Sequence, residues 1–187
     1  LDCFGDRLSS TNAMLDFIRT RPDLKDREIY VVGHSWGGYA AASITAFHPE
    51  IKGIVAISPV LSMKDLLKNT EKPYPALAQA FFIFIDCLKC GKFALADGVK
   101  NIENFARNGG KVIVIQSEDD GIVPYKSSLG LLKKHFGLSE NEEKPAGLNI
   151  KLITVKNRKH NPHYTDSAIA ILSEFFDVNA AIMVKNA

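Results

Sequence analysis

Short runs of aliphatic residues alternate along the chain with longer segments in which apolar residues recur every three or four positions. The short runs are rich in Ile and Val, show little polar alternation, and cover residues 28–32, 53–58, 111–117 and 150–155. Runs of this kind are typical of parallel strands that are covered on both faces. We therefore expect four parallel strands joined by helical crossovers, which is the α/β class.

The helical pattern fills the segments between and beside these strands. Apolar spacings of three and four predict helices over residues 10–20, 126–136 and 165–176. An alanine-rich stretch over residues 37–47 predicts a helix that lies close to the sheet. With 187 residues the chain is long enough for one well-buried core, so we expect residues 1–187 to form a single domain.

The segment from residue 59 to residue 108 is too long for a simple crossover. It contains helix-like pieces over residues 76–88 and 99–106. We expect a helical cap at about residues 60–108, above the sheet, with ordinary packing against the sheet as the alternative. Its aromatic and proline residues would then line an apolar pocket for an acyl or alcohol group: Pro73, Tyr74, Phe81, Phe82 and Phe84.

Composition narrows the choice of partners and of compartment. The formal net charge is +2 and no run of basic residues stands out, so nothing indicates nucleic acid. The longest apolar run, residues 76–85, is too short to cross a bilayer, and the first residues do not form a signal peptide. We expect no membrane partner and a cytoplasmic location.

Three cysteines are an odd and sparse set, which fits a reducing compartment. Cys87 and Cys90 form a CxxC pair, but a structural zinc site needs two further ligands at suitable spacing, and the sequence offers none. We therefore expect no metal site, with both thiols packed on a helix as small apolar groups.

The stretch Gly33–Gly37 reads GHSWG and lies between a predicted strand and a predicted helix. This is the setting of a nucleophile elbow, a sharp turn that exposes a serine hydroxyl, here that of Ser35. We expect the glycines on either side to prevent clashes between strand and helix. The N–H group of Trp36, at the helix N-terminus, would stabilise an oxyanion.

A serine hydroxyl needs a base, and the base needs an orienting acid. The strand over residues 111–117 is followed by EDDGIVPY, in which Asp120 is our choice for the acid and Asp119 is the alternative. The strand over residues 150–155 is followed by a loop with two histidines. There His160 is preferred to His163 as the base.

These three motifs, GHSWGG, SEDDGIVP and RKHNPHYT, resemble those of α/β-hydrolase fold proteins, in the same order along the chain. The resemblance implies a serine that attacks an ester, thioester or amide carbonyl, with no metal or organic cofactor. It assigns the catalytic roles to Ser35, Asp120 and His160. We also expect His34, packed under the elbow, and Tyr125 to contact a small-molecule acyl substrate.

The resemblance favours a serine hydrolase that acts on carboxylesters or thioesters through an acyl-enzyme. Three alternatives remain open: a peptidase similar to prolyl oligopeptidase, a binding domain without activity, and an acyl transferase.

The chain departs from the family at its N-terminal side, because only the stretch LDCFGDRLSS and one helix precede the elbow strand. The family's sheet usually has about eight strands, and the elbow strand is the fifth. A sheet that begins at this strand would expose an apolar edge. We expect either a longer protein or a further chain, such as a second copy, to cover that edge and to supply the second oxyanion donor.

Overall fold

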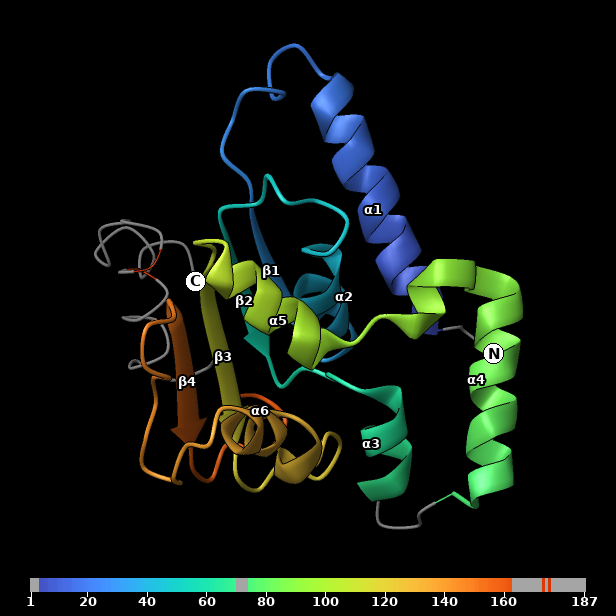
Figure 1. Cartoon of the computed structure of the whole chain (residues 1–187), viewed down its shortest axis with the longest axis vertical. Helices are drawn as coiled ribbons and strands as arrows, with labels where there is room; N and C mark the ends of the chain where they lie inside the picture. Colours follow the sequence, from blue (N-terminus) through green and yellow to red (C-terminus); the bar gives the residue numbers. More distant parts are fainter. Residues whose placement is uncertain (1–3, 70–73, 163–172, 174, 176–187) are drawn as a thin grey trace.

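A computed structural model describes residues 4–69 and 74–162, together with residues 173 and 175. Four parallel strands form one sheet in the order of the sequence (Figure 1). They are β1 (Tyr30–His34), β2 (Gly53–Ile57), β3 (Lys111–Ser117) and β4 (Ile150–Val155). The α/β class predicted from the aliphatic runs is confirmed.

The first strand lies two residues further along the chain than predicted. Tyr30 pairs with Gly53 and His34 pairs with Ile57, so the ladder with β2 continues up to the residue before Ser35. Parallel strands place their carboxyl ends at one edge of a sheet. The segments that follow β1, β3 and β4 therefore meet at this edge.

Helices cover one face of the sheet and form the main core with it. These helices are α2 (Trp36–Ile44), α5 (Gly98–Arg107) and α6 (Leu129–His135), and α1 (Phe4–Thr20) packs against α2. Leu8, Ile44, Ile102 and Leu132 are fully buried against sheet residues such as Ile54. A short 3-10 turn, η2 (Tyr125–Ser127), precedes α6.

The opposite face carries a smaller apolar cluster from β2, β3 and β4, made of Val55, Ile57, Ile113, Ile115 and Ile153. Phe175 packs against it, and its ring also meets the edge of the Tyr30 ring. Apart from residues 173 and 175, the helix predicted over residues 165–176 lies outside the described residues.

Strand β1 forms one edge of the sheet, and within the described ranges no strand pairs with its outer side. The expectation that all four strands are covered on both faces was wrong for this one. Val32 in its middle is 52% exposed, whereas all residues of β2 are buried.

The segment expected to form a cap divides into two parts. Helix α5 belongs to the layer on the sheet, because its apolar side is buried against α2 and β3. Helices α3 (Met63–Asn69) and α4 (Ala76–Cys90) and the 3-10 turn η1 (Gly91–Leu95) lie outside that layer. The C-terminal end of α4 meets the first turn of α1, at the right of Figure 1.

A buried carboxylate joins α4 to α1. Asp86 is 5% exposed, and both of its oxygens lie 3.3 Å from the N–H of Gly5 in the first turn of α1. A carboxylate at a helix N-terminus satisfies N–H groups that have no partner within the helix. The described part of α1 thus includes residues 4–9, ahead of the start predicted at residue 10.

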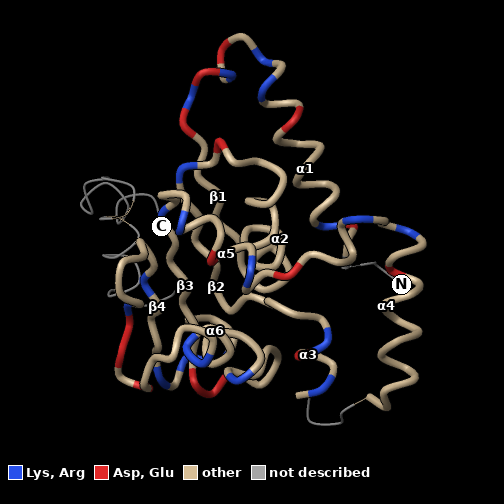
Figure 2. Tube along the Cα trace, viewed as in Figure 1, with Lys and Arg blue, Asp and Glu red and all other residues tan. Residues whose placement is uncertain are grey.

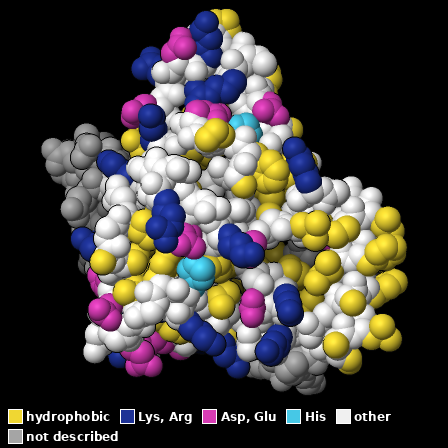
Figure 3. All heavy atoms as spheres, viewed as in Figure 1, with side chains coloured by type: hydrophobic (Ala, Val, Ile, Leu, Met, Phe, Trp, Pro, Cys, Tyr) yellow, Lys and Arg dark blue, Asp and Glu magenta, His cyan; other side chains and the backbone are white. Residues whose placement is uncertain are grey.

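Several of the aromatic rings expected to line an apolar pocket are open to solvent, and the pocket stays a prediction. Phe81 and Phe84 are more than half exposed, and Tyr74 just before the helix is 44% exposed. Figure 3 shows apolar side chains gathered over α4, and Figure 2 shows that this helix carries almost no charge. Pro73 lies outside the described residues.

Charges of both signs are mixed along the rest of the chain, with no band of one sign (Figure 2). In the described part of the chain, no helix combines the length and the apolar character needed to cross a bilayer.

The phenol of Tyr39 makes the stability of this fold sensitive to alkaline pH. The ring lies in the core and the hydroxyl donates to the carbonyl of Phe93 at 3.1 Å. Burial, aided by the negative charge of Asp86, raises the pKa of Tyr39 to about 12. A group whose pKa is raised on folding stabilises the folded state below its unfolded pKa and loses this effect as the pH rises through the folded value.

We expect the urea midpoint to fall between about pH 10 and pH 12, and to fall less in Tyr39→Phe, which has no proton to lose. Circular dichroism at a series of pH values measures this. Tyr74→Phe, at an exposed ring, is the control. Equal alkaline losses in all three proteins would show that Tyr39 does not carry the effect.

Candidate active site

Ser35 occupies a strained turn between β1 and α2. Its backbone has φ 56° and ψ −113°, a conformation that costs a residue with a side chain about 1–3 kcal/mol. Two hydrogen bonds hold the turn: the N–H of Ser35 donates to Ile57 at 2.8 Å, and its carbonyl accepts from Tyr39 at 3.1 Å. A strained strand-to-helix turn therefore lies at Ser35, and the role of this turn as a nucleophile elbow stays a prediction.

Close contacts require glycine at two of the three positions around Ser35. The two are Gly33 and Gly38, whereas the sequence predicts Gly33 and Gly37. A Cβ atom on Gly33 would overlap the backbone of Gly37, and one on Gly38 would lie 2.9 Å from the Cα of Pro59. A Cβ on Gly37 would meet nothing within 4 Å. The expectation that Gly37 prevents a clash was wrong, because its α-carbon faces open space and it contributes only its backbone.

Trp36 is the first residue of α2. The first N–H groups of an α-helix point out of its N-terminus, where the helix dipole favours negative charge. The backbone thus places an N–H group directly after the Ser35 hydroxyl, as the predicted oxyanion role requires.

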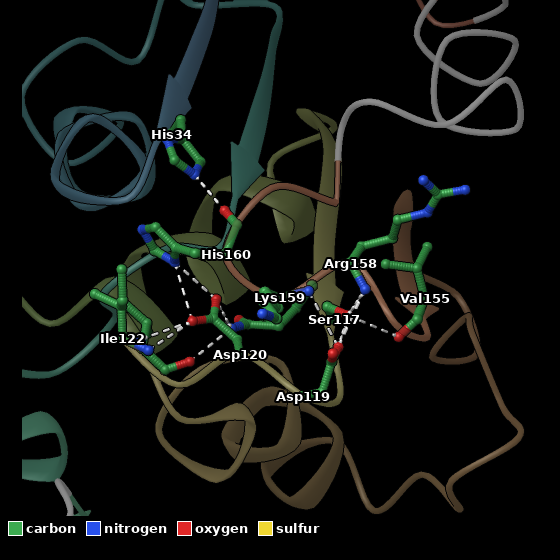
Figure 4. A network of polar contacts seen from close by, with 11 residues as sticks. His34, Ser117, Asp119, Asp120, Ile122, Val155, Arg158, Lys159 and His160 are labelled. Atoms are coloured by element: carbon green, nitrogen blue, oxygen red, sulfur yellow. Dashed lines mark hydrogen bonds and ion pairs between the residues drawn. The ribbon is translucent and has the colours of Figure 1, made fainter.

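Asp120 and His160 are in direct contact across the loops that follow β3 and β4 (Figure 4). The Nδ1 atom of His160 lies 2.8 Å and 3.0 Å from the two carboxylate oxygens of Asp120. The Asp120 side chain is fully buried and that of His160 is 13% exposed. With His160 Nδ1–H as the donor, the Nε2 atom is left as the basic one.

Three further donors fix the Asp120 carboxylate. The N–H groups of Ile122 and Val123 each donate to Oδ1 at 2.9 Å, and the amide of Gln116 donates to Oδ2 at 3.0 Å. Gln116 is fully buried and also donates to the carbonyl of Val123. This carboxylate is therefore held rigidly toward the imidazole.

His34 connects the elbow to the His160 loop. Its Nε2 atom lies 2.7 Å from the carbonyl oxygen of His160, so this nitrogen carries a proton and donates. The two imidazole rings lie 4.6 Å apart. No hydrogen bond joins the Ser35 hydroxyl to His160 in this structure; such contacts are often loose until substrate binds.

Asp119 lies apart from the His160 ring. Its Oδ1 atom accepts from the Ser117 hydroxyl and from the N–H groups of Arg158 and Lys159, each 3.2 Å away (Figure 4). Of the two adjacent carboxylates, the structure thus brings Asp120 to His160. His163, the alternative base, lies outside the described residues.

Tyr125 is engaged in the fold. Its hydroxyl lies 2.9 Å from that of Thr154 in β4, and its ring packs against the main core. Burial raises the pKa of this phenol. The structure places His34 and Tyr125 in contacts with the protein itself, so their expected substrate contacts stay predictions.

Within the described ranges, no three His, Cys, Asp or Glu side chains come close enough to hold a metal ion. Cys87 and Cys90 lie on α4, and the Cys90 thiol donates to Asp6 at 3.2 Å.

Sequence reasoning missed Gln116 and the bridging role of His34. A signal for Gln116 exists, because it is an uncharged polar residue that directly follows the aliphatic stretch VIVI of this strand. The hydrogen bond of His34 has no sequence signal, because its acceptor lies 126 residues further along the chain.

Comparison with known proteins agrees with this architecture. A family model described as alpha/beta hydrolase fold matches residues 3–86, which include the elbow. A search of curated proteins finds no match.

Several solved structures are similar to this chain at low sequence identity. Est1E from Butyrivibrio proteoclasticus, with ferulic acid bound, is 16% identical with a TM-score of 0.66, over 94% of this chain and 68% of that one. The Pyrococcus furiosus esterase Pf2001 is 16% identical with a TM-score of 0.56, over 94% and 60%. A putative dipeptidyl aminopeptidase IV from Bacteroides ovatus is 17% identical with a TM-score of 0.55, over 89% and 22%.

The chain has the alpha/beta hydrolase fold. At these identities the solved structures establish the fold, and the chemistry has to be argued from the residues of this chain.

The contrast between Gly33 and Gly37 gives a direct test of the elbow. Gly33→Ala forces the backbone of the turn apart, so we expect a loss of about 1–3 kcal/mol or more in the free energy of unfolding. Gly37→Ala introduces a better helix former into open space and should be neutral or stabilising by up to about 1 kcal/mol. Urea denaturation of both variants measures the difference. An equal effect at the two positions would contradict the assigned geometry.

Proposed function

We propose that this protein is a serine hydrolase that cleaves carboxylesters or thioesters through an acyl-enzyme. The observation that carries the proposal is the buried Asp120 carboxylate at 2.8 Å from His160 Nδ1, in a loop that His34 ties to the Ser35 elbow. A hydroxyl, an acid and a base, in this order along the chain, form the set that acyl transfer needs.

In the proposed acylation, the Oγ atom of Ser35 attacks the carbonyl carbon while His160 Nε2 takes the hydroxyl proton. Asp120 holds the ring in the required tautomer and stabilises the imidazolium. The N–H of Trp36 donates to the oxygen that becomes negative. When the tetrahedral intermediate collapses, the leaving alcohol or thiol takes the proton from His160, and the acyl group stays on Ser35.

In the proposed deacylation, water replaces the leaving group. His160 removes a proton from the water as it attacks the acyl carbon, and returns this proton to Ser35 when the carboxylic acid departs. The cycle consumes one water and regenerates the serine. Neither step uses a metal or an organic cofactor.

One similar structure, Pf2001, is described as an esterase, which supports ester-type substrates for this chain. The similarity to a putative dipeptidyl aminopeptidase IV supports a peptidase as the second candidate. A chain with the fold but without activity is the third reading. That the rest of a longer protein, or a further chain such as a second copy, covers the edge of β1 remains a prediction.

Hydrolysis of a panel of p-nitrophenyl acyl esters and aminoacyl p-nitroanilides tests the proposal. We expect turnover of the esters, background rates for Ser35→Ala, and a loss of about 10⁴-fold in kcat for Asp120→Asn, whose amide favours the wrong tautomer. Release of nitroaniline without ester turnover would favour the peptidase.

The controls are matched by position. Ser10→Ala removes an exposed hydroxyl from α1, and Glu118→Gln neutralises an exposed acid in the same loop as Asp120. Both should keep the parent rate. Ester turnover that survives in Ser35→Ala would refute the assigned nucleophile.

A further inference from the structure

The loop that carries His160 has a strained backbone. Between the end of β4 and His160, both Asn157 and Lys159 have positive φ, at 58° and 49°. Residues with side chains adopt this conformation at a cost, so surrounding contacts have to hold it in place. The position of the imidazole therefore depends on whatever fixes residues 157–159.

Asp119 and Ser117 provide that support, in an arrangement we call the Asp119 bridge. Ser117 is the last residue of β3 and pairs with Val155, the last residue of β4. The N–H of Arg158 lies 3.2 Å from the Ser117 hydroxyl and 3.2 Å from Asp119 Oδ1. The same Oδ1 accepts from Lys159 at 3.2 Å and from the Ser117 hydroxyl.

The neighbouring carboxylates Asp119 and Asp120 bind different parts of the His160 loop. Asp120 binds the His160 ring, His34 binds its carbonyl, and Asp119 binds the two N–H groups just before it. Figure 4 shows the two carboxylates directed to different parts of the same loop.

We propose that Asp119, with Ser117, is a positioning residue that holds the strained His160 loop so that the imidazole reaches both Asp120 and Ser35. The inference deepens the proposed serine hydrolase function and rests on it. It predicts that losing the bridge impairs the chemical step more than substrate binding, because no atom of the bridge needs to touch the substrate.

The charge of Asp119 suits this role at neutral pH. The hydrogen bond from Ser117 is the main cause that lowers the pKa of this exposed carboxyl, and the N–H groups of Lys159 and Arg158 add to it. Because its pKa is lowered, the Asp119 carboxylate takes up a proton only at a lower pH than an ordinary carboxyl group does. The carboxylate is therefore charged, and the bridge intact, at neutral pH. Tests at pH 7 therefore examine the intact bridge.

Three variants at pH 7 test the proposal, with Glu118→Ala as the matched control for a lost carboxylate in the same loop. Asp119→Ala should lower kcat for an ester substrate by about 10- to 100-fold with little change in KM, since small displacements of a catalytic group have effects of this size. Asp119→Asn keeps an oxygen acceptor and should recover most of the loss. Ser117→Ala should fall between them.

A second measurement is independent of turnover. The Nδ1 proton of His160, shared with Asp120, should give a resolved downfield proton NMR signal in the parent and in Glu118→Ala. This signal should broaden or vanish in Asp119→Ala, while the fold is retained by circular dichroism. A parent without esterase activity but with this pattern would refute the proposed function and leave the bridge supported.

Two results would overturn the inference. One is an unchanged kcat and His160 signal in Asp119→Ala. The other is equal loss in Asp119→Ala and Glu118→Ala, which would mean that the charge of the loop matters and the bridge does not.

Discussion

The site depends on the absence of a side chain at Gly33. The turn at Ser35 brings the backbone of α2 so close to the end of β1 that a Cβ atom on Gly33 would overlap Gly37. With that atom present, the strand could not pass directly into the helix, and the hydroxyl and the helix N-terminus would separate. Because β1 pairs with β2 up to His34, the turn is also tied to the sheet that positions the other two loops.

The second requirement is that two irregular loops keep a fixed distance from this turn. Parallel pairing of β3 with β4 ends at Ser117 and Val155, so the loops with Asp120 and His160 leave the sheet side by side. Beyond the strand ends, side-chain hydrogen bonds hold the two loops. Gln116 and two backbone N–H groups bind Asp120. His34 and Asp119 bind the loop of His160. These hydrogen bonds thus fix the positions of the two loops where the pairing of the strands ends.

The sequence predicts the features that depend on local pattern. The aliphatic runs identify four strands by their composition. GHSWG followed by alanines identifies the sharp turn between β1 and α2, because such a turn needs glycine at a fixed position. The sequence leaves open whether Asp119 or Asp120 faces His160, since adjacent residues in an irregular loop share no such pattern. It also misses the contact of Asp86 with α1 and that of Tyr125 with Thr154, because each partner lies far away in the chain.

The most direct test of the account is covalent trapping of the nucleophile. The protein is treated with a fluorophosphonate, and its intact mass and its peptides are analysed by mass spectrometry, with Ser35→Ala in parallel. The account predicts one adduct per chain, on the peptide that contains Ser35, and none in the variant. A folded protein that stays unlabelled, or that carries its adduct on another residue, would contradict it.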